Sequence, residues 1–104
     1  MITAEFKTHC GEIVSFRVSG HSGYAESGSD IVCAAVSANV RFAVNLISET
    51  FGVENRLSVD DDNAVVDFSF TQGDPRAQGV ANALYDELSA LRDEYPGFVR
   101  VVRN

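Results

Sequence analysis

The chain has 104 residues, with 15 acidic and 8 basic side chains and a formal net charge of −7, which gives a pI of about 4.6. A chain of this length buries one hydrophobic core but not two, so we expect residues 1–104 to form a single domain. Because nucleic-acid-binding domains concentrate Lys and Arg on one surface, the negative charge disfavours direct binding to nucleic acid. It favours a basic protein as partner.

The first ten residues, MITAEFKTHC, contain no cationic segment followed by a long apolar run, and no uncharged stretch of the chain approaches 18 residues. We therefore expect no export signal and no membrane span, and we predict a cytoplasmic location. The two cysteines, Cys10 and Cys33, are too few for a disulfide scaffold and are expected to be free thiols.

Alternation of apolar and polar residues predicts two strands at the start of the chain. Residues 2–8 place Ile2, Ala4 and Phe6 on one face, and residues 14–18 do the same with Val14, Phe16 and Val18. The turn at Cys10-Gly11 between them predicts a hairpin. A loop with three glycines then runs from Gly20 to Ser29.

The period changes to that of a helix over residues 30–49, with Asp30 as the expected N-cap and Gly52 just past the end. Its polar positions form one stripe: Cys33, Ser37, Arg41, Asn45 and Ser48. The rest of this helix is apolar over more of its circumference than contact with one sheet requires, which makes part of it a candidate dimer contact.

Residues 53–59 and 64–70 read as a second hairpin joined by an acidic turn, Asp60 to Asn63. A second helix is expected from Asp74 as cap and Pro75 as first residue to Pro96-Gly97, and residues 98–102 form a last strand. The apolar face of this helix comprises Ala77, Val80, Ala81, Leu84, Leu88 and Leu91.

The predicted fold is α+β, in the order β-β-α-β-β-α-β. The outward residues of the strands are mostly polar, namely Thr3, Glu5, Lys7, Ser15, Arg17, Asp67 and Ser69. One face of the sheet is therefore solvated, and both helices should cover the other face. We expect two layers, a mostly antiparallel five-stranded sheet and two helices on one face.

Cys33 is a candidate nucleophile because, with Asp30 as cap, it is the third residue of the helix. Unpaired backbone N–H groups and the helix dipole in a first turn favour the thiolate form, which is the reactive form of cysteine. The same N–H groups could also stabilise the oxyanion formed when a thiolate attacks a carbonyl. The alternative is a small, inert, buried side chain. The position of Cys33 at the head of the polar stripe favours exposure.

His21 could supply the base that a nucleophilic cysteine needs, provided that the glycine-rich loop folds back towards Cys33. The alternative is a solvent-exposed loop histidine. Asp30 is a helix cap and also a candidate orienter of the imidazole. Ser37 either bonds near the thiol or bonds back to its own helix. Gly23 and Gly28 either let the loop close over a substrate or satisfy turns.

Other cysteine and loop chemistries fit poorly. A cysteine-dependent phosphatase needs an Arg six positions after the Cys, where this chain has Asn39. No Lys follows the glycines, as a phosphate-binding loop would require. Zinc binding by His9, Cys10, His21 and Cys33 matches no ligand spacing, and His9 and Cys10 point to opposite faces of a strand. We therefore expect no metal and no cofactor.

The stretch GHSGYAESGSDIVCAAVSA, from Gly20 to Ala38, resembles the signature of the ribosomal-processing cysteine protease family, Prp. The resemblance implies a homodimer in which Cys33 is the nucleophile and His21 the base, while Gly20, Asp30 and Ser37 also occupy motif positions. It implies removal of the N-terminal extension of the large-subunit ribosomal protein L-twenty-seven, by cleavage after a pair of aromatic residues.

The resemblance also makes the loop from Ser22 to Ser29 a mobile cover over the substrate groove, with Ser22, Gly23, Tyr24 and Gly28 as its candidate residues. The competing hypothesis is a non-enzymatic, ribosome-associated binding module in which Cys33 serves only for packing.

Overall fold

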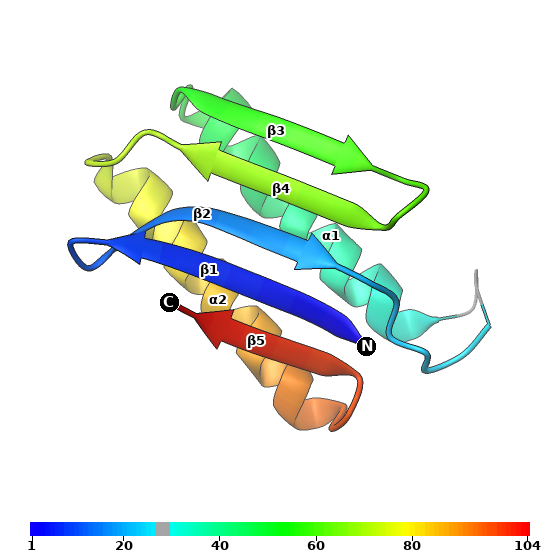
Figure 1. Ribbon diagram of the computed structural model, residues 1–104. Coiled ribbons are helices and arrows are strands. Elements are labelled where there is room, and N and C mark those ends of the chain that lie inside the picture. The colour runs from blue at the N-terminus through cyan, green and yellow to red at the C-terminus, as the bar shows by residue number, and fades with distance from the viewer. Residues whose placement is uncertain (27–29) are drawn as a thin grey trace.

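The computed structural model describes residues 1–26 and 30–104 and confirms the predicted order of elements. Figure 1 shows this arrangement. The elements are β1 (Ile2–His9), β2 (Glu12–Ser19), α1 (Ile31–Asn45), a π-helical turn η1 (Leu46–Thr50), β3 (Asn55–Asp60), β4 (Val65–Phe70), α2 (Pro75–Glu94) and β5 (Val99–Arg103).

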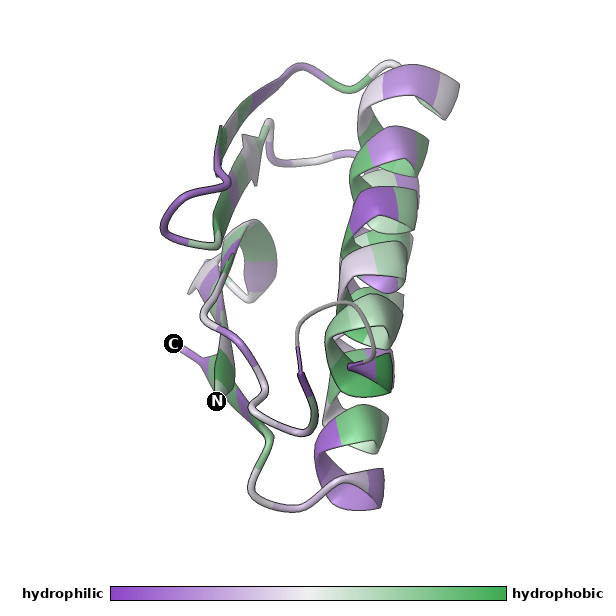
Figure 2. Ribbon diagram, turned by 90° about the vertical axis from the view of Figure 1, so that its right-hand side faces the viewer, coloured by the Kyte–Doolittle hydropathy of each residue, from purple (hydrophilic) through white to green (hydrophobic). Residues whose placement is uncertain are grey.

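The five strands form one sheet in the order β3-β4-β2-β1-β5. In the described residues, β1–β2, β2–β4 and β3–β4 are antiparallel pairs, and β1 and β5 run parallel. The sheet is therefore mostly antiparallel, as predicted, with β3 and β5 at its edges. Both helices lie on the same face, so the molecule has one layer of sheet and one of helix (Figure 2).

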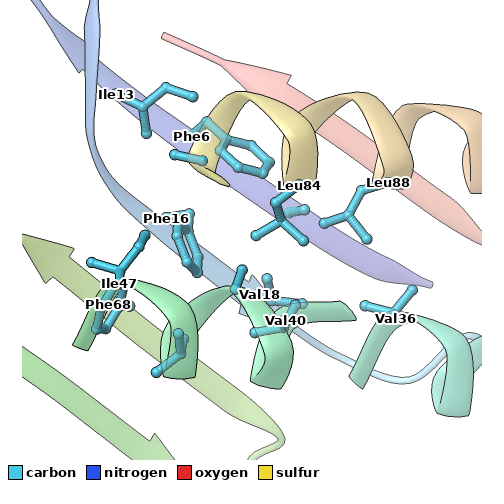
Figure 3. Close-up of a cluster of buried hydrophobic side chains, with 14 of the residues drawn as sticks. Phe6, Ile13, Phe16, Val18, Val36, Val40, Ile47, Phe68, Leu84 and Leu88 are labelled. Atoms are coloured by element: carbon cyan, nitrogen blue, oxygen red, sulfur yellow. The ribbon is translucent and has the colours of Figure 1, made fainter. Parts of the chain in front are cut away.

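Aromatic rings from the strands fill the space between the layers. Phe6, Phe16 and Phe68 are each 0 % exposed, and the Phe16 ring centroid lies 5.7 Å from that of Phe6 and 5.3 Å from that of Phe68. The same buried cluster contains Val36 and Val40 of α1 and Leu84 and Leu88 of α2 (Figure 3). Full burial of one such side chain stabilises the fold by about 1.5–3 kcal/mol.

The β1–β2 hairpin contains an irregularity that the alternation of residues did not predict. Lys7 pairs with Ser15, but Thr8 pairs with Ile13, so Val14 lies in a β-bulge. The bulge turns Ile13 into the core at 0 % exposure and leaves Val14 only half-buried. The expectation that Val14 shares the inner face of the strand is therefore wrong, because one extra residue reverses the alternation.

Helix α1 begins as predicted, with Asp30 as N-cap, but its last turn differs from the prediction. After Asn45 the chain forms the π-helical turn η1, in which the N–H of Phe51 donates to the carbonyl of Leu46 at 2.9 Å. Gly52 then ends the helix with a φ of +61°. The wider turn also keeps Ile47 in the core.

Ile31–Thr50 is the one segment of the described residues that is long and apolar enough to span a membrane by length and composition alone. The core helix of a globular domain passes the same test. In this fold the stretch covers the sheet with Val32, Val36, Val40, Ala43, Val44 and Ile47, all buried.

Candidate active site

The loop after β2 brings its first residues to the start of α1. The N-terminus, this loop and the β3–β4 turn all lie at that end of the sheet (Figure 1). Gly20 begins the loop with a φ of +89°, and its N–H donates to the carbonyl of Ala64 at 3.0 Å. A Cβ here would lie 2.5 Å from the carbonyl oxygen of Met1. The close approach of the chain start and the positive φ both require glycine immediately before His21.

Ser22 connects this loop to the helix. It is only 4 % exposed. Its hydroxyl donates to Oδ2 of Asp30 and accepts the N–H of Tyr24 at 3.1 Å. Its own N–H donates to Sγ of Cys33, with 3.3 Å between nitrogen and sulfur. The loop is thus hydrogen-bonded both to the helix cap and to the candidate nucleophile.

Asp30 caps α1 through its other carboxylate oxygen. Oδ1 accepts the N–H groups of Val32 and Cys33, each at 3.0 Å. Hydrogen bonds from the Ser22 hydroxyl, which has the largest effect, and from the Cys33 N–H lower the pKa of Asp30 from 3.8 to about 2. The carboxylate is therefore ionised at neutral pH.

These contacts correct one expectation about the start of α1. The N–H groups of Val32 and Cys33 are not free to bind an oxyanion, because Asp30 already occupies them. The N–H of Ala34 donates to the carbonyl of the same aspartate at 3.1 Å. Among the described residues, the side-chain bonds of Asp30 run to Ser22, Val32 and Cys33 rather than to His21. The role of cap is confirmed, and the imidazole is not hydrogen-bonded to this carboxylate.

Cys33 is half-buried and in contact with the core on one side. On the other side it lines a cavity of about 310 Å³ together with His21, Gly20 and Ser37. A second cavity, of about 430 Å³, joins Cys33, His21 and Ser37 to Asp30 and Gly23. Ser37 and His21 are exposed. The fold therefore places residues from the loop and from the first two turns of α1 around the thiol of Cys33: Gly20, His21, Gly23, Asp30 and Ser37.

The cavity continues as a groove between α1 and the β3–β4 hairpin. A further hollow of about 350 Å³ shares Val36, Ser37 and Val59 with the first and extends to Arg41 and Leu57. Leu57 is 48 % exposed and Val59 54 %, although both lie in a strand. Leu57 and Val59 were not predicted as part of the site, because their alternation is typical of a core-facing strand. Only their place at the sheet edge, beyond the cover of α1, exposes them.

The predicted loop residues differ in their surroundings. Gly23 is exposed with a φ of +72°. Tyr24 is 44 % exposed, and its ring makes edge contacts with Tyr95 and Phe98 at centroid distances of 5.6 and 5.2 Å. The predicted loop residue Gly28 lies outside the described residues. The other cysteine, Cys10, is exposed and lies in the β1–β2 turn.

The residues that the structure describes hold no group of three or more His, Cys, Asp or Glu side chains arranged to bind a metal ion. The site instead offers a free, half-buried thiol and an imidazole facing one groove. That combination of groups is typical of a cysteine-dependent hydrolase.

Comparisons with known proteins agree. The family described as Cysteine protease Prp matches residues 1–100. The Ribosomal processing cysteine protease Prp of Bacillus subtilis (strain 168) is 34 % identical over 103 residues, which cover 94 % of this chain and 92 % of that protein.

Solved structures share the fold. The crystal structure of SMU.848 from Streptococcus mutans has 28 % sequence identity and a TM-score of 0.85, covering 100 % of this chain and 96 % of the other. The essential ribosomal processing protease Prp from S. aureus, in complex with a covalently linked product peptide, has 24 % identity and a TM-score of 0.94 over the full length of both chains.

The chain thus belongs to the Prp family of cysteine proteases. The alternative of a non-enzymatic binding module is set aside by this membership.

Proposed function

We propose that Cys33 is the nucleophile and His21 the general base of this protease, and that residues 1–104 act as one protease domain. The observation that carries the proposal is that both side chains line the same cavity at the start of α1. Sγ of Cys33 also receives a backbone N–H, a contact that favours a thiolate.

The proposed reaction proceeds through an acyl-enzyme. The imidazole of His21 accepts the proton of Cys33, and the sulfur forms a bond to the scissile carbonyl carbon. The peptide C–N bond then breaks as the imidazolium returns the proton to the leaving amine. Water hydrolyses the thioester to a carboxylic acid and regenerates the thiol.

We infer that the substrate is the precursor of ribosomal protein L-twenty-seven, from which the enzyme removes the N-terminal extension. The Bacillus subtilis relative is named as a ribosomal processing enzyme. A net charge of −7 suits a basic protein substrate better than nucleic acid, which we do not expect to be bound directly. The valine-lined hollow beside Cys33 suits apolar or aromatic side chains next to the scissile bond. Gly23 and Tyr24 would border the bound peptide.

The test is cleavage of a peptide spanning the precursor junction, followed by mass spectrometry. Cys33→Ala and His21→Ala should abolish cleavage, while Cys10→Ala, which removes the exposed cysteine of the β1–β2 turn, should cleave like the wild type. Cleavage by the Cys33→Ala protein would refute the assignment of the nucleophile. Efficient cleavage of a peptide whose aromatic pair is replaced by alanine would refute the specificity.

A homodimer in the cytoplasm completes the proposal. On the outer side of the helix layer, Phe42 is 67 % exposed and borders an apolar groove of about 520 Å³ between α1 and α2. Leu46 and Val80 also line this groove. A two-fold axis would let each copy insert Phe42 into the groove of the other, which is the self-complementary geometry of a symmetric dimer.

Light scattering should therefore report a dimer, and Phe42→Arg should report a monomer that still unfolds cooperatively. A monomeric wild type at micromolar concentration would contradict the dimer. A dimeric Phe42→Arg variant would contradict this interface.

A further inference from the structure

Ser22 has contacts that neither the proposed nucleophile nor the proposed base explains. We propose that Ser22 is a positioning residue, whose hydroxyl ties the loop to Asp30 so that the Ser22 backbone N–H stays on Sγ of Cys33 and favours the thiolate. This inference rests on the proposed role of Cys33. It changes the role expected for Ser22, from part of a mobile cover to a fixed support beneath the thiol.

The side chain of Ser22 is buried and fully hydrogen-bonded. Among the described residues it alone has a polar side chain that is buried, at 4 % exposure. A hydroxyl is costly to bury unless it is hydrogen-bonded, and this one both donates to Asp30 and accepts from the N–H of Tyr24. Both contacts fix the position of the Ser22 backbone, which carries the N–H that faces the sulfur.

The first backbone N–H groups of α1 are already bonded. Asp30 takes the N–H groups of Val32 and Cys33 that would otherwise face an anion at this helix end. The N–H of Ser22 lies 3.3 Å from Sγ and comes from outside the helix. Hydrogen bonding to the charged form of a group favours that form, so this donor supports the thiolate that the helix N–H groups do not contact.

The charge of Asp30 affects ionisation of the Cys33 thiol. A carboxylate beside a sulfur opposes ionisation of the thiol unless the carboxylate charge is offset by donors. The Ser22 hydroxyl bonds this carboxylate together with the N–H groups of Val32 and Cys33 and the Cys33 side chain, and the hydroxyl has the largest effect on its pKa. Removal of the hydroxyl therefore acts twice against the thiolate: it loosens the N–H on the sulfur and leaves the nearby charge less compensated.

Titratable side chains from three elements line the cavities that border the thiol. Asp30 caps the helix of Cys33, His21 comes from the loop, and Asp60 and Asp61 come from the β3–β4 turn that lines the same cavity. A change at Ser22 removes none of these four groups. Because the hydroxyl itself bonds Asp30, its loss should shift the pH dependence of thiol reactivity through the N–H on Sγ and through the charge of Asp30.

The experiment measures the alkylation rate of Cys33 by iodoacetamide between about pH 5 and pH 9, in a Cys10→Ala background that removes the other thiol. Ser22→Ala should move the rate profile to higher pH, with a rate about tenfold lower near neutral pH and the same plateau at high pH, as expected for a weakened hydrogen bond to a charged group. Ser22→Thr, which keeps a hydroxyl, should restore the profile. Profiles of Ser22→Ala and its parent that superimpose would overturn the proposal.

A second pair of variants separates the loss of the hydroxyl from a loss of folding. If Ser22→Ala lowers the melting temperature, Ser22→Thr is compared with Ser22→Val, which has nearly the same shape without the hydroxyl; equal profiles in this pair also overturn the proposal. The alkylation assay needs no substrate, so it is independent of the peptide assay. A wild type that fails to cleave the precursor peptide counts against the proposed function alone. With an active wild type, Ser22→Ala should lower kcat and leave KM unchanged.

Discussion

Replacement of Gly20 by alanine tests how the start of the chain positions the loop that carries His21. Gly20 has a φ of +89°, a backbone conformation that costs a side-chain-bearing residue about 1–3 kcal/mol. The added Cβ would also lie 2.5 Å from the carbonyl oxygen of Met1, 0.9 Å short of the 3.4 Å at which ordinary contacts begin. Because a backbone oxygen cannot rotate away as a side chain can, either the loop or the start of β1 must move.

Forcing extra atoms into a packed site costs about 1–3 kcal/mol more. Gly11 offers a matched control, since its φ is +81° and its Cβ would meet nothing within 4 Å. Gly11→Ala should therefore lose only the stability that a positive φ costs a residue with a side chain. Gly20→Ala should be less stable than Gly11→Ala by about 1–3 kcal/mol, which corresponds to about 4–8 °C in Tm for each kcal/mol in a domain of this size.

Urea denaturation followed by circular dichroism measures both variants, and peptide cleavage measures the effect on the site. Gly20→Ala should also lose most of its activity, because Ile2 and His21 line the same cavity as Cys33 and the shift occurs between them. Equal stability of the two variants would refute the argument from close approach. Full activity of a destabilised Gly20→Ala would refute its link to the site.

Three further predictions concern the core, the cap and the loop. Phe16→Ala should lower the free energy of unfolding by about 3–5 kcal/mol in urea denaturation, because the ring is 0 % exposed between two other phenylalanines; a loss below about 1 kcal/mol would contradict this packing. The folded-state pKa of Asp30, about 2 against an ordinary 3.8, means that its charged form adds stability above about pH 4 that is lost as the pH falls towards 2. Asp30→Asn should lack this part of the acid destabilisation in urea titrations across that range, and an unchanged pH dependence would be inconsistent with the contacts of Asp30. Tyr24→Ala should speed cleavage after Glu26 by a glutamyl endopeptidase, because the edge contacts that anchor the loop are lost; an unchanged rate would argue against anchoring.

The local features of the chain could be predicted because they depend on neighbours in sequence. Asp30 and Asp74 cap the two helices as their side chains and positions indicate, and both hairpins form where turn residues separate alternating segments. Three members of the polar stripe of α1, Ser37, Arg41 and Asn45, are exposed as predicted, whereas Cys33 and Ser48 are half-buried. A helical period fixes which residues share a face, whatever the helix packs against.

Other features depended on contacts between distant residues. The bulge at Val14 arises from the register between two strands, and the exposure of Leu57 and Val59 arises from the place of β3 at the sheet edge. The parallel pairing of β5 with β1 also has no local signal, because alternation specifies a strand but not its partner.

For the candidate site, the sequence by itself determined that Cys33 stands in the first turn of a capped helix, after a loop that begins with Gly20 and His21. Only the tertiary structure decided that the cap occupies the helix N–H groups, and that the N–H of Ser22 faces the sulfur instead. The physical reason is that a helix and its cap are determined by residues only a few positions apart. The path of the loop back onto that helix depends instead on contacts with distant parts of the chain. Ser22 bonds the cap, Tyr24 packs at the end of α2, and Gly20 lies against the start of the chain.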